Sequence, residues 1–243
     1  MTRYAFRLEY IGKEYFGSQK QPKRVTIQSE VEKALCTLIK TKIRTIFSGR
    51  TDKGVNAKGQ IVHFDYDKPI VASRFCNSMN GLLPKDISVS DLKVVDDDFH
   101  AQKSARKRTY KYVFYNREFR SAFDGDLLLV KYDLNIERMN ESLSYLEGLH
   151  NFSAFRASNT TVLNDDCFIY KAECQKLGDT VEITICGSRF LYNMVRTIVG
   201  TLLDIERHNL SSSKMKEILE SRDRTQAGQT VNPYGLTLMK VEY

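Results

Sequence analysis

The connection SGRTDKGVNAKGQ, residues 48–60, joins two segments with the composition of β-strands, Ile43–Phe47 and Gln60–Asp65. A plain hairpin needs only a couple of turn residues between its strands. This connection is longer, is rich in glycine, and carries Asp52 two residues after Arg50. Because catalytic groups concentrate on loops held by a rigid scaffold, the stretch predicts a functional loop. A solvated aspartate on a polar loop is the structural alternative.

The segments around this loop alternate between strands and helices. Tyr4–Tyr10 alternates apolar and polar residues as a strand does, and Val71–Leu83 and Ile87–Val95 read as a helix and a strand. Thr26 can cap a helix whose apolar residues recur at helical spacing: Ile27, Val31, Leu35, Leu38 and Ile39. The resulting order, β-α-β-β-α-β, predicts a ferredoxin-like unit.

A second set of elements follows Asp96-Asp97-Asp98 in the same order, with additions. The predicted strands are Arg108–Tyr115, a hairpin of Ile169–Gln175 and Val181–Cys186, and Leu236–Val241. The predicted helices are Asn135–Leu149, Phe190–Glu206 and Ser212–Glu220. The sequence therefore predicts an α+β protein with two ferredoxin-like halves, residues 1–104 and 105–243, whose sheets are antiparallel.

Composition narrows the class of partner. The chain has 243 residues with 42% hydrophobic content, enough for a sizeable core, and a net charge of +7. That excess favours a polyanion such as nucleic acid, although an ordinary basic protein has a similar balance. No apolar run reaches the length of a membrane span, and the N-terminus lacks a signal-peptide core, so we expect a cytoplasmic protein.

The cysteines and histidines indicate neither disulfides nor a metal site. The five cysteines are odd in number and form no C-x-x-C pair, which fits a reducing compartment. The four histidines are scattered along the chain, which argues against a dedicated metal cluster.

Three stretches together resemble one known family. The loop around Asp52 closely resembles the G-R-T-D-x-G-V-x-A signature of the tRNA pseudouridine synthase A family, in which the aspartate is catalytic. Residues 188–196, SRFLYNMVR, are similar to its R-F-L-Y-x-M-V-R segment, and residues 99–112, FHAQKSARKRTYKY, to its F-H-A-R-x-S-A…R-x-Y-x-Y segment. Weaker matches extend the resemblance, in order, over essentially the whole chain.

The resemblance implies an isomerase that converts uridine to pseudouridine in the anticodon stem-loop of tRNA, at positions 38–40. It implies a homodimer with no cofactor and no metal, and two halves joined around a central RNA-binding cleft. Asp52 is then the nucleophile, and Tyr110 stacks on the flipped uracil and assists proton abstraction. Arg50 enters the RNA and helps to displace the target nucleotide, while Lys107 and Arg108 contact phosphates.

Arg196 lies on a predicted helix that is apolar nearly all round and should be buried. A buried guanidinium requires a carboxylate or several acceptors. The resemblance makes Asp52 that partner, which would keep the nucleophile ionised. Asp204 and Glu206 are the alternative partners in a purely structural ion pair.

The chain departs from the family pattern at several positions. Ser18 stands where the family has tryptophan, Lys53 replaces a small residue, Asn56 a histidine and Gln102 an arginine, while Gln229 and Asn232 replace prolines. Lys53 and Asn56 lie beside Asp52 in the loop.

Two rival functions remain open at this level. A non-catalytic RNA-binding protein has no need of a buried pair between arginine and aspartate. A metal-dependent nuclease would use Asp52, Asp65 and Asp67, but no third carboxylate is fixed by spacing on the strand that carries Asp65.

Overall fold

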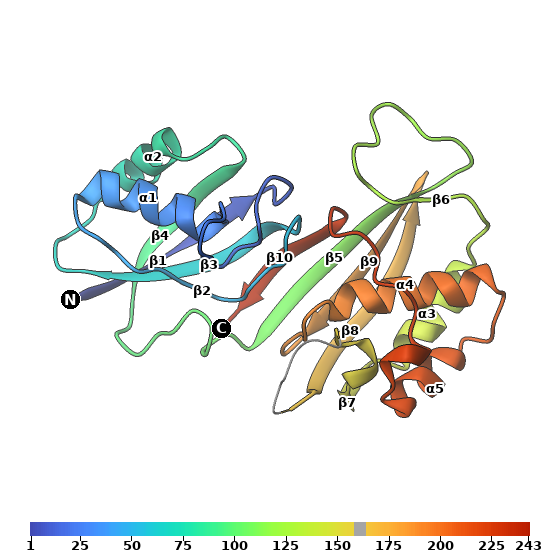
Figure 1. Cartoon of the computed structure of the whole chain (residues 1–243). Helices are drawn as coiled ribbons and strands as arrows, with labels where there is room; N and C mark the ends of the chain where they lie inside the picture. Colours follow the sequence, from blue (N-terminus) through green and yellow to red (C-terminus); the bar gives the residue numbers. More distant parts are fainter. Residues whose placement is uncertain (158–163) are drawn as a thin grey trace. The chain divides into compact units, whose positions relative to one another are not determined.

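The computed structural model describes residues 1–157 and 164–243. These residues form two compact units, Met1–Arg106 together with Thr237–Tyr243, and Lys107–Leu236 (Figure 1). Each unit combines a sheet with helices, so the predicted α+β class is confirmed. The C-terminal segment Thr237–Tyr243 clusters with the first unit.

The first unit has the strand order of a ferredoxin-like fold. Strand β1 (Thr2–Tyr10) lies between β4 (Ile87–Val95) and β3 (Asn56–Tyr66), and is antiparallel to both. The short strand β2 (Ile46–Phe47) pairs antiparallel with β3, which completes the order β4-β1-β3-β2. Strand β10 (Leu236–Glu242) runs parallel to the start of β3.

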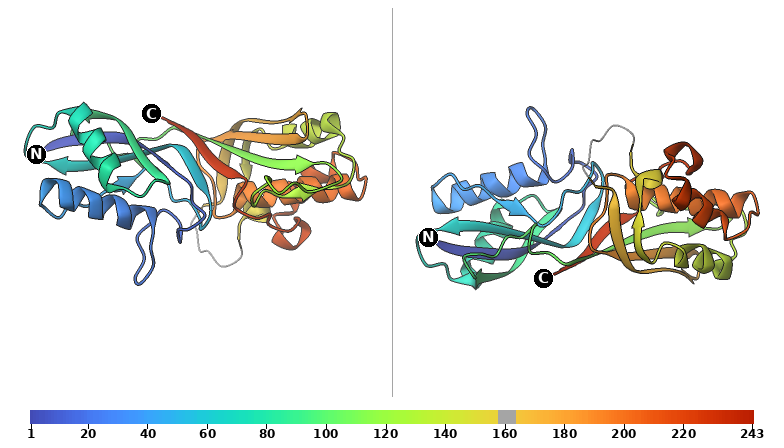
Figure 2. Two further views of the ribbon diagram at one scale, coloured as in Figure 1. Left: turned by 90° about the horizontal axis from the view of Figure 1, so that it is seen from above. Right: turned by 90° about the horizontal axis from the view of Figure 1, so that it is seen from below.

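Two helices lie on one side of this sheet, α1 (Ile27–Ile39) and α2 (Ala72–Leu82) (Figures 1 and 2). Thr26 caps α1 as predicted, and it forms a reciprocal capping box with Ser29. The core between helices and sheet is aromatic. The rings of Phe64 and Phe75 stack with centroids 5.9 Å apart, and Phe6 lies against both.

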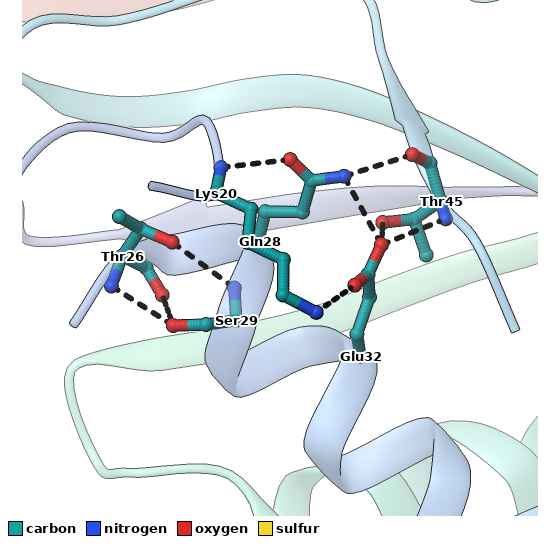
Figure 3. A network of polar contacts seen from close by, with 6 residues as sticks. All are labelled: Lys20, Thr26, Gln28, Ser29, Glu32 and Thr45. Atoms are coloured by element: carbon teal, nitrogen blue, oxygen red, sulfur yellow. Dashed lines mark hydrogen bonds and ion pairs between the residues drawn. The ribbon is translucent and has the colours of Figure 1, made fainter. Parts of the chain in front are cut away.

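The strand before the Asp52 loop is shorter than predicted, and the strand after it is longer. Thr45 leaves the ladder because its N–H and its hydroxyl both donate to Glu32 Oε1 on α1, each at 3.1 Å (Figure 3). Strand β3 begins at Asn56 because β10 pairs with it there. The Asp52 loop therefore spans residues 48–55.

The sheet of the second unit has the order β5-β9-β8-β7, with every neighbour antiparallel. Its strands are β5 (Lys107–Asn116), β7 (Gly148–Asn151), β8 (Asp166–Leu177) and β9 (Thr180–Gly187), with β6 (Leu129–Val130) parallel to β5. The predicted hairpin of β8 and β9 is confirmed.

Helices α3 (Ile136–Ser144), α4 (Met194–Arg207) and α5 (Lys214–Ser221) lie on one side of this sheet (Figures 1 and 2). Two one-turn 3-10 helices, Ser153–Phe155 and Arg224–Gln226, complete the unit. In the part of the chain that the structure describes, no helix is long and apolar enough to cross a membrane.

Two predicted helices have different ends. The helix predicted to reach Leu149 stops at Ser144, because Gly148 has a φ of 99° and starts β7. The helix predicted from Phe190 starts at Met194, because Asn193 has a φ of 63°. Asparagine tolerates this left-handed conformation better than most residues, so it can interrupt an otherwise helical pattern.

Candidate active site

The Asp52 loop is anchored through the residue between Arg50 and Asp52. Thr51 is buried, and its N–H donates to Ser18 Oγ at 2.8 Å. Its carbonyl oxygen accepts from the Ser18 N–H at 3.0 Å. With Thr51 fixed inward, Arg50 is left exposed and Asp52 half-buried.

A buried polar network supports the loop from the sheet. The Tyr10 hydroxyl and Thr51 Oγ1 form a hydrogen bond of 2.8 Å. Gln60 Nε2 donates to the Gly49 carbonyl oxygen at 2.9 Å and lies 3.4 Å from the Tyr10 hydroxyl, while Ser48 Oγ donates to Gln60 Oε1. Burial raises the pKa of Tyr10 to about 12, although its hydrogen bonds act in the opposite direction. Tyr10 is therefore a neutral phenol at physiological pH.

The chain before α1 packs closely against the loop at two glycines. Gly17 has a φ of 83°, and a Cβ atom there would lie 2.7 Å from the Thr51 carbonyl oxygen. A Cβ atom at Gly12 would lie 2.0 Å from the Val55 carbonyl oxygen, and the Gly12 N–H donates to Asn56 Oδ1 at 2.8 Å. Only glycine fits such close approaches, so both ends of the loop have a fixed backbone.

The remaining candidate residues belong to the second unit. Tyr110 lies on β5, is 8% exposed, and meets the Phe190 ring edge-on at 5.1 Å between centroids. Lys107 Nζ lies 4.5 Å from the Tyr170 ring centroid, and Arg108 Nη1 donates to the Ser188 carbonyl oxygen at 2.7 Å. Both cations at the start of β5 are thus held in place by neighbouring groups.

Arg196 lies in the first turn of α4, where its side chain is half-buried. Its Nε donates to the Val231 carbonyl oxygen and its Nη1 to Asn193 Oδ1, both at 2.8 Å. Burial raises the pKa of Tyr112, and the positive charge of Arg196 opposes that shift.

Glu206, one of the alternative partners of Arg196, is occupied elsewhere. Its two carboxylate oxygens accept from Arg138 Nε at 2.7 Å and Nη2 at 2.9 Å. The helix that carries Arg196 is apolar and buried along most of its length, as predicted. The pairing of Arg196 with Asp52 involves residues of different units and stays a prediction.

The structure gives no support to a metal-dependent nuclease. Asp65 forms a two-point ion pair with Arg3, with distances of 2.7 and 2.9 Å, which holds the pKa of that carboxyl below its usual range. Among residues 1–157 and 164–243, no three His, Cys, Asp or Glu side chains are grouped so that they could hold a metal ion. All five cysteines are free thiols.

Comparison with known proteins places the chain in a family. The model of the tRNA pseudouridine synthase family matches residues 8–102 and 143–243. The chain belongs to the tRNA pseudouridine synthase family. It is 41% identical to the tRNA pseudouridine synthase A of Bacillus subtilis, over 97% of each chain. The tRNA pseudouridine synthase A of Thermoanaerobacter sp. is 39% identical over 97% of each chain. The tRNA pseudouridine synthase A of Caldicellulosiruptor saccharolyticus is 37% identical over 100% of each chain.

Several residues that support the Asp52 loop were not identified from the sequence alone. Tyr10, Ser48 and Gln60 form the hydrogen bonds that hold the Asp52 loop, and each is less than 4% exposed. The sequence gives only a weak indication of this role. Each residue has a polar group at a position that is expected to be buried in or beside a strand. Ser18 and Asn56 appeared only as departures from the family pattern. Ser18 accepts a hydrogen bond from the loop residue Thr51, and Asn56, which follows the loop, accepts one from Gly12.

Proposed function

We propose that this chain isomerises uridine to pseudouridine in the anticodon stem-loop of tRNA, at positions 38–40, as a cytoplasmic homodimer. Membership of the tRNA pseudouridine synthases supports the reaction, and the net charge of +7 fits an RNA substrate. The observation that carries the proposal is the anchoring of Thr51, which holds the half-buried Asp52 carboxylate in a rigid loop.

The reaction breaks the bond between uracil N1 and the ribose, turns the uracil, and joins C5 to the same ribose carbon. Asp52 is the nucleophile, because a carboxylate can form a covalent adduct and then leave. The proton on C5 must be removed after the new carbon–carbon bond forms. Tyr110 stacks on the extruded uracil, and its hydroxyl assists this proton transfer.

The cationic candidates take two different roles. Arg196 keeps Asp52 ionised, since a neighbouring positive charge favours the carboxylate form. Its bonds to Val231 and Asn193 support this role, because they fix the guanidinium in one orientation. Arg50 is exposed and adjoins the anchored Thr51, so it can enter the RNA while its backbone stays fixed. Lys107 and Arg108 contact phosphates, which position the RNA.

The proposal is tested by incubating the purified protein with unmodified transcripts of several tRNAs and mapping pseudouridine at single-nucleotide resolution. Pseudouridine at one or more of positions 38, 39 and 40, and at no other position, is the expected result. A matched set of transcripts with cytidine at those three positions should give no product. Binding without any pseudouridine would instead identify a non-catalytic RNA-binding protein, and product at other positions would overturn the proposed target.

A further inference from the structure

Two cationic side chains lie over the ring of Phe16, in the segment between β1 and α1. The guanidinium carbon of Arg24 is 4.3 Å from the ring centroid, and Lys53 Nζ is 4.5 Å from the same centroid. A cation over an aromatic face is attracted by the ring's negative electrostatic potential. Such contacts hold a side chain in place and leave its positive charge available. Lys53 directly follows Asp52, so this cluster adjoins the proposed nucleophile.

The loop that carries Arg24 is closed by short hydrogen bonds. The Phe16 N–H donates to the Val25 carbonyl oxygen at 3.0 Å, and Gln21 Nε2 donates to the Phe16 carbonyl oxygen at 2.8 Å. Phe16 is therefore bound through its backbone to the same loop whose Arg24 covers its ring. This arrangement fixes Arg24 relative to the ring.

A second network fixes the other side of this loop (Figure 3). The Lys20 N–H donates to Gln28 Oε1 at 2.9 Å, and Lys20 Nζ forms an ion pair of 2.9 Å with Glu32. Gln28 Nε2 in turn donates to Glu32 Oε1 and to the Thr45 carbonyl oxygen. Lys20 is thus neutralised inside a structural network, whereas Arg24 and Lys53 are exposed.

The positive charges of Arg24 and Lys53 lie on exposed side chains. Within residues 1–157 and 164–243, neither forms an ion pair with an acidic side chain, and the Phe16 ring is the contact they share. Both cationic groups contact one ring, so an anion beside that ring is attracted by two positive charges. In an RNA substrate, that anion is a backbone phosphate.

We propose that Arg24 and Lys53 together bind a backbone phosphate of the tRNA beside the target uridine. The inference rests on the proposed function, because it takes Asp52 to mark where the target nucleotide is held. Phosphate contacts fix the register and orientation of a nucleic acid without reading its sequence. Lys53 stands where the family pattern has a small residue.

The test compares Arg24→Ala, Lys53→Ala and the double variant with Lys93→Ala. Lys93 is an exposed lysine on β4, which β1 separates from β3 in the same sheet, and it serves as the matched control. The dissociation constant for one tRNA is measured at four or more salt concentrations. Each lost phosphate contact should lower the slope of log Kd against log salt by about 0.7–0.9. The double variant should also have a KM several-fold above that of the wild type. Lys53→Arg, which keeps the positive charge, should have the same salt slope as the wild type.

The outcomes separate this inference from the proposed function. If the wild-type protein makes pseudouridine and both alanine variants keep the salt slope of Lys93→Ala, the phosphate site is refuted and the reaction stands. If the wild-type protein makes no pseudouridine, the proposed function is refuted, whatever the salt slopes of the variants. A salt slope lowered by Lys53→Ala but not by Arg24→Ala would contradict a shared site. Thermal unfolding of each variant shows whether any loss comes from the fold.

Discussion

Tyr4 and Tyr10 are buried phenols at the two ends of β1, and they allow the loop network to be tested at the scale of one atom. The Tyr10 hydroxyl bonds to Thr51, whereas the Tyr4 hydroxyl donates to the Lys68 carbonyl oxygen at 3.1 Å. Tyr10→Phe should cost about 1–3 kcal/mol of stability, because Thr51 loses a buried partner. It should also lower turnover, because the Asp52 loop loses an anchor.

Tyr4→Phe is the control, since it removes a hydroxyl from the same strand away from the loop. Urea unfolding should show a loss of stability in both variants. Tritium release from tRNA labelled at uracil C5 should fall in Tyr10→Phe alone. Equal turnover in the two variants would show that the network is only structural.

At the scale of the element, the start of α4 depends on Asn193, which has a left-handed backbone and accepts a hydrogen bond from Arg196. Asn193→Gly keeps the backbone conformation and removes the amide, whereas Asn193→Ala also adds a conformational cost of about 1–2 kcal/mol. Both variants should lose turnover if Asn193 orients Arg196, and only the alanine variant should lose that additional stability. An Asn193→Gly enzyme with wild-type turnover would contradict the role given to Arg196.

The segment after β4 is held to β3 by a histidine that should make the fold sensitive to acid. His63 Nδ1 accepts from the Ala101 N–H at 3.1 Å, and burial, with the nearby charges of Arg3 and His100, lowers the pKa of His63 to about 4. Because the unfolded chain binds this proton near pH 6.5, stability is full above that pH and falls as the pH drops towards 4. The loss from this group is on the order of 2–3 kcal/mol.

Urea unfolding at several pH values between 7.5 and 4.5 measures this dependence. His63→Asn should flatten it, whereas His208→Asn, at an exposed histidine, should leave it unchanged. An unchanged pH dependence in His63→Asn would assign the acid sensitivity to other groups.

Local patterns predicted most elements, and the exceptions have tertiary or single-residue causes. The capping box at Thr26 and the hairpin of β8 and β9 depend on neighbours in sequence, so they could be predicted. The short length of β2 could not be predicted, because it depends on a hydrogen bond from the Thr45 N–H to Glu32 on α1. The late start of α4 depends on one φ angle, and periodicity carries no sign of it.

At the scale of the whole molecule, the resemblance to a family predicts the candidate site residues. It does not predict the residues that hold the Asp52 loop in place. Asp52 and Arg196 are predicted as site residues because they lie in dense sequence signatures. Tyr10 and Ser18 are far from the loop in sequence, and they meet it only because β1 pairs with β3 and because the chain before α1 packs on the loop. Likewise, the pairing of β10 with β3 brings the C-terminal strand beside a strand about 180 residues earlier in the sequence, which a local pattern cannot indicate.

The net charge of +7 predicts that tRNA binding depends strongly on salt. Replacing Lys107 and Arg108 by alanine together should weaken binding to all tRNAs alike and lower the salt slope by roughly 1.4–1.8, for two phosphate contacts. Filter binding with three unrelated tRNAs at several salt concentrations checks this. Affinity that is indifferent to salt would contradict the assigned class of substrate.

The central claim is that Asp52 is the nucleophile, and Asp52→Asn tests it most directly. The amide keeps the size of the side chain and removes the anion that forms the adduct. Tritium release from tRNA labelled at uracil C5 is measured beside filter binding on the same protein. Tritium release should vanish while tRNA binding is retained or becomes slightly stronger, because a negative charge near the RNA is lost. Full activity in Asp52→Asn would contradict the mechanism, and loss of binding together with activity would make Asp52 a structural residue of the loop.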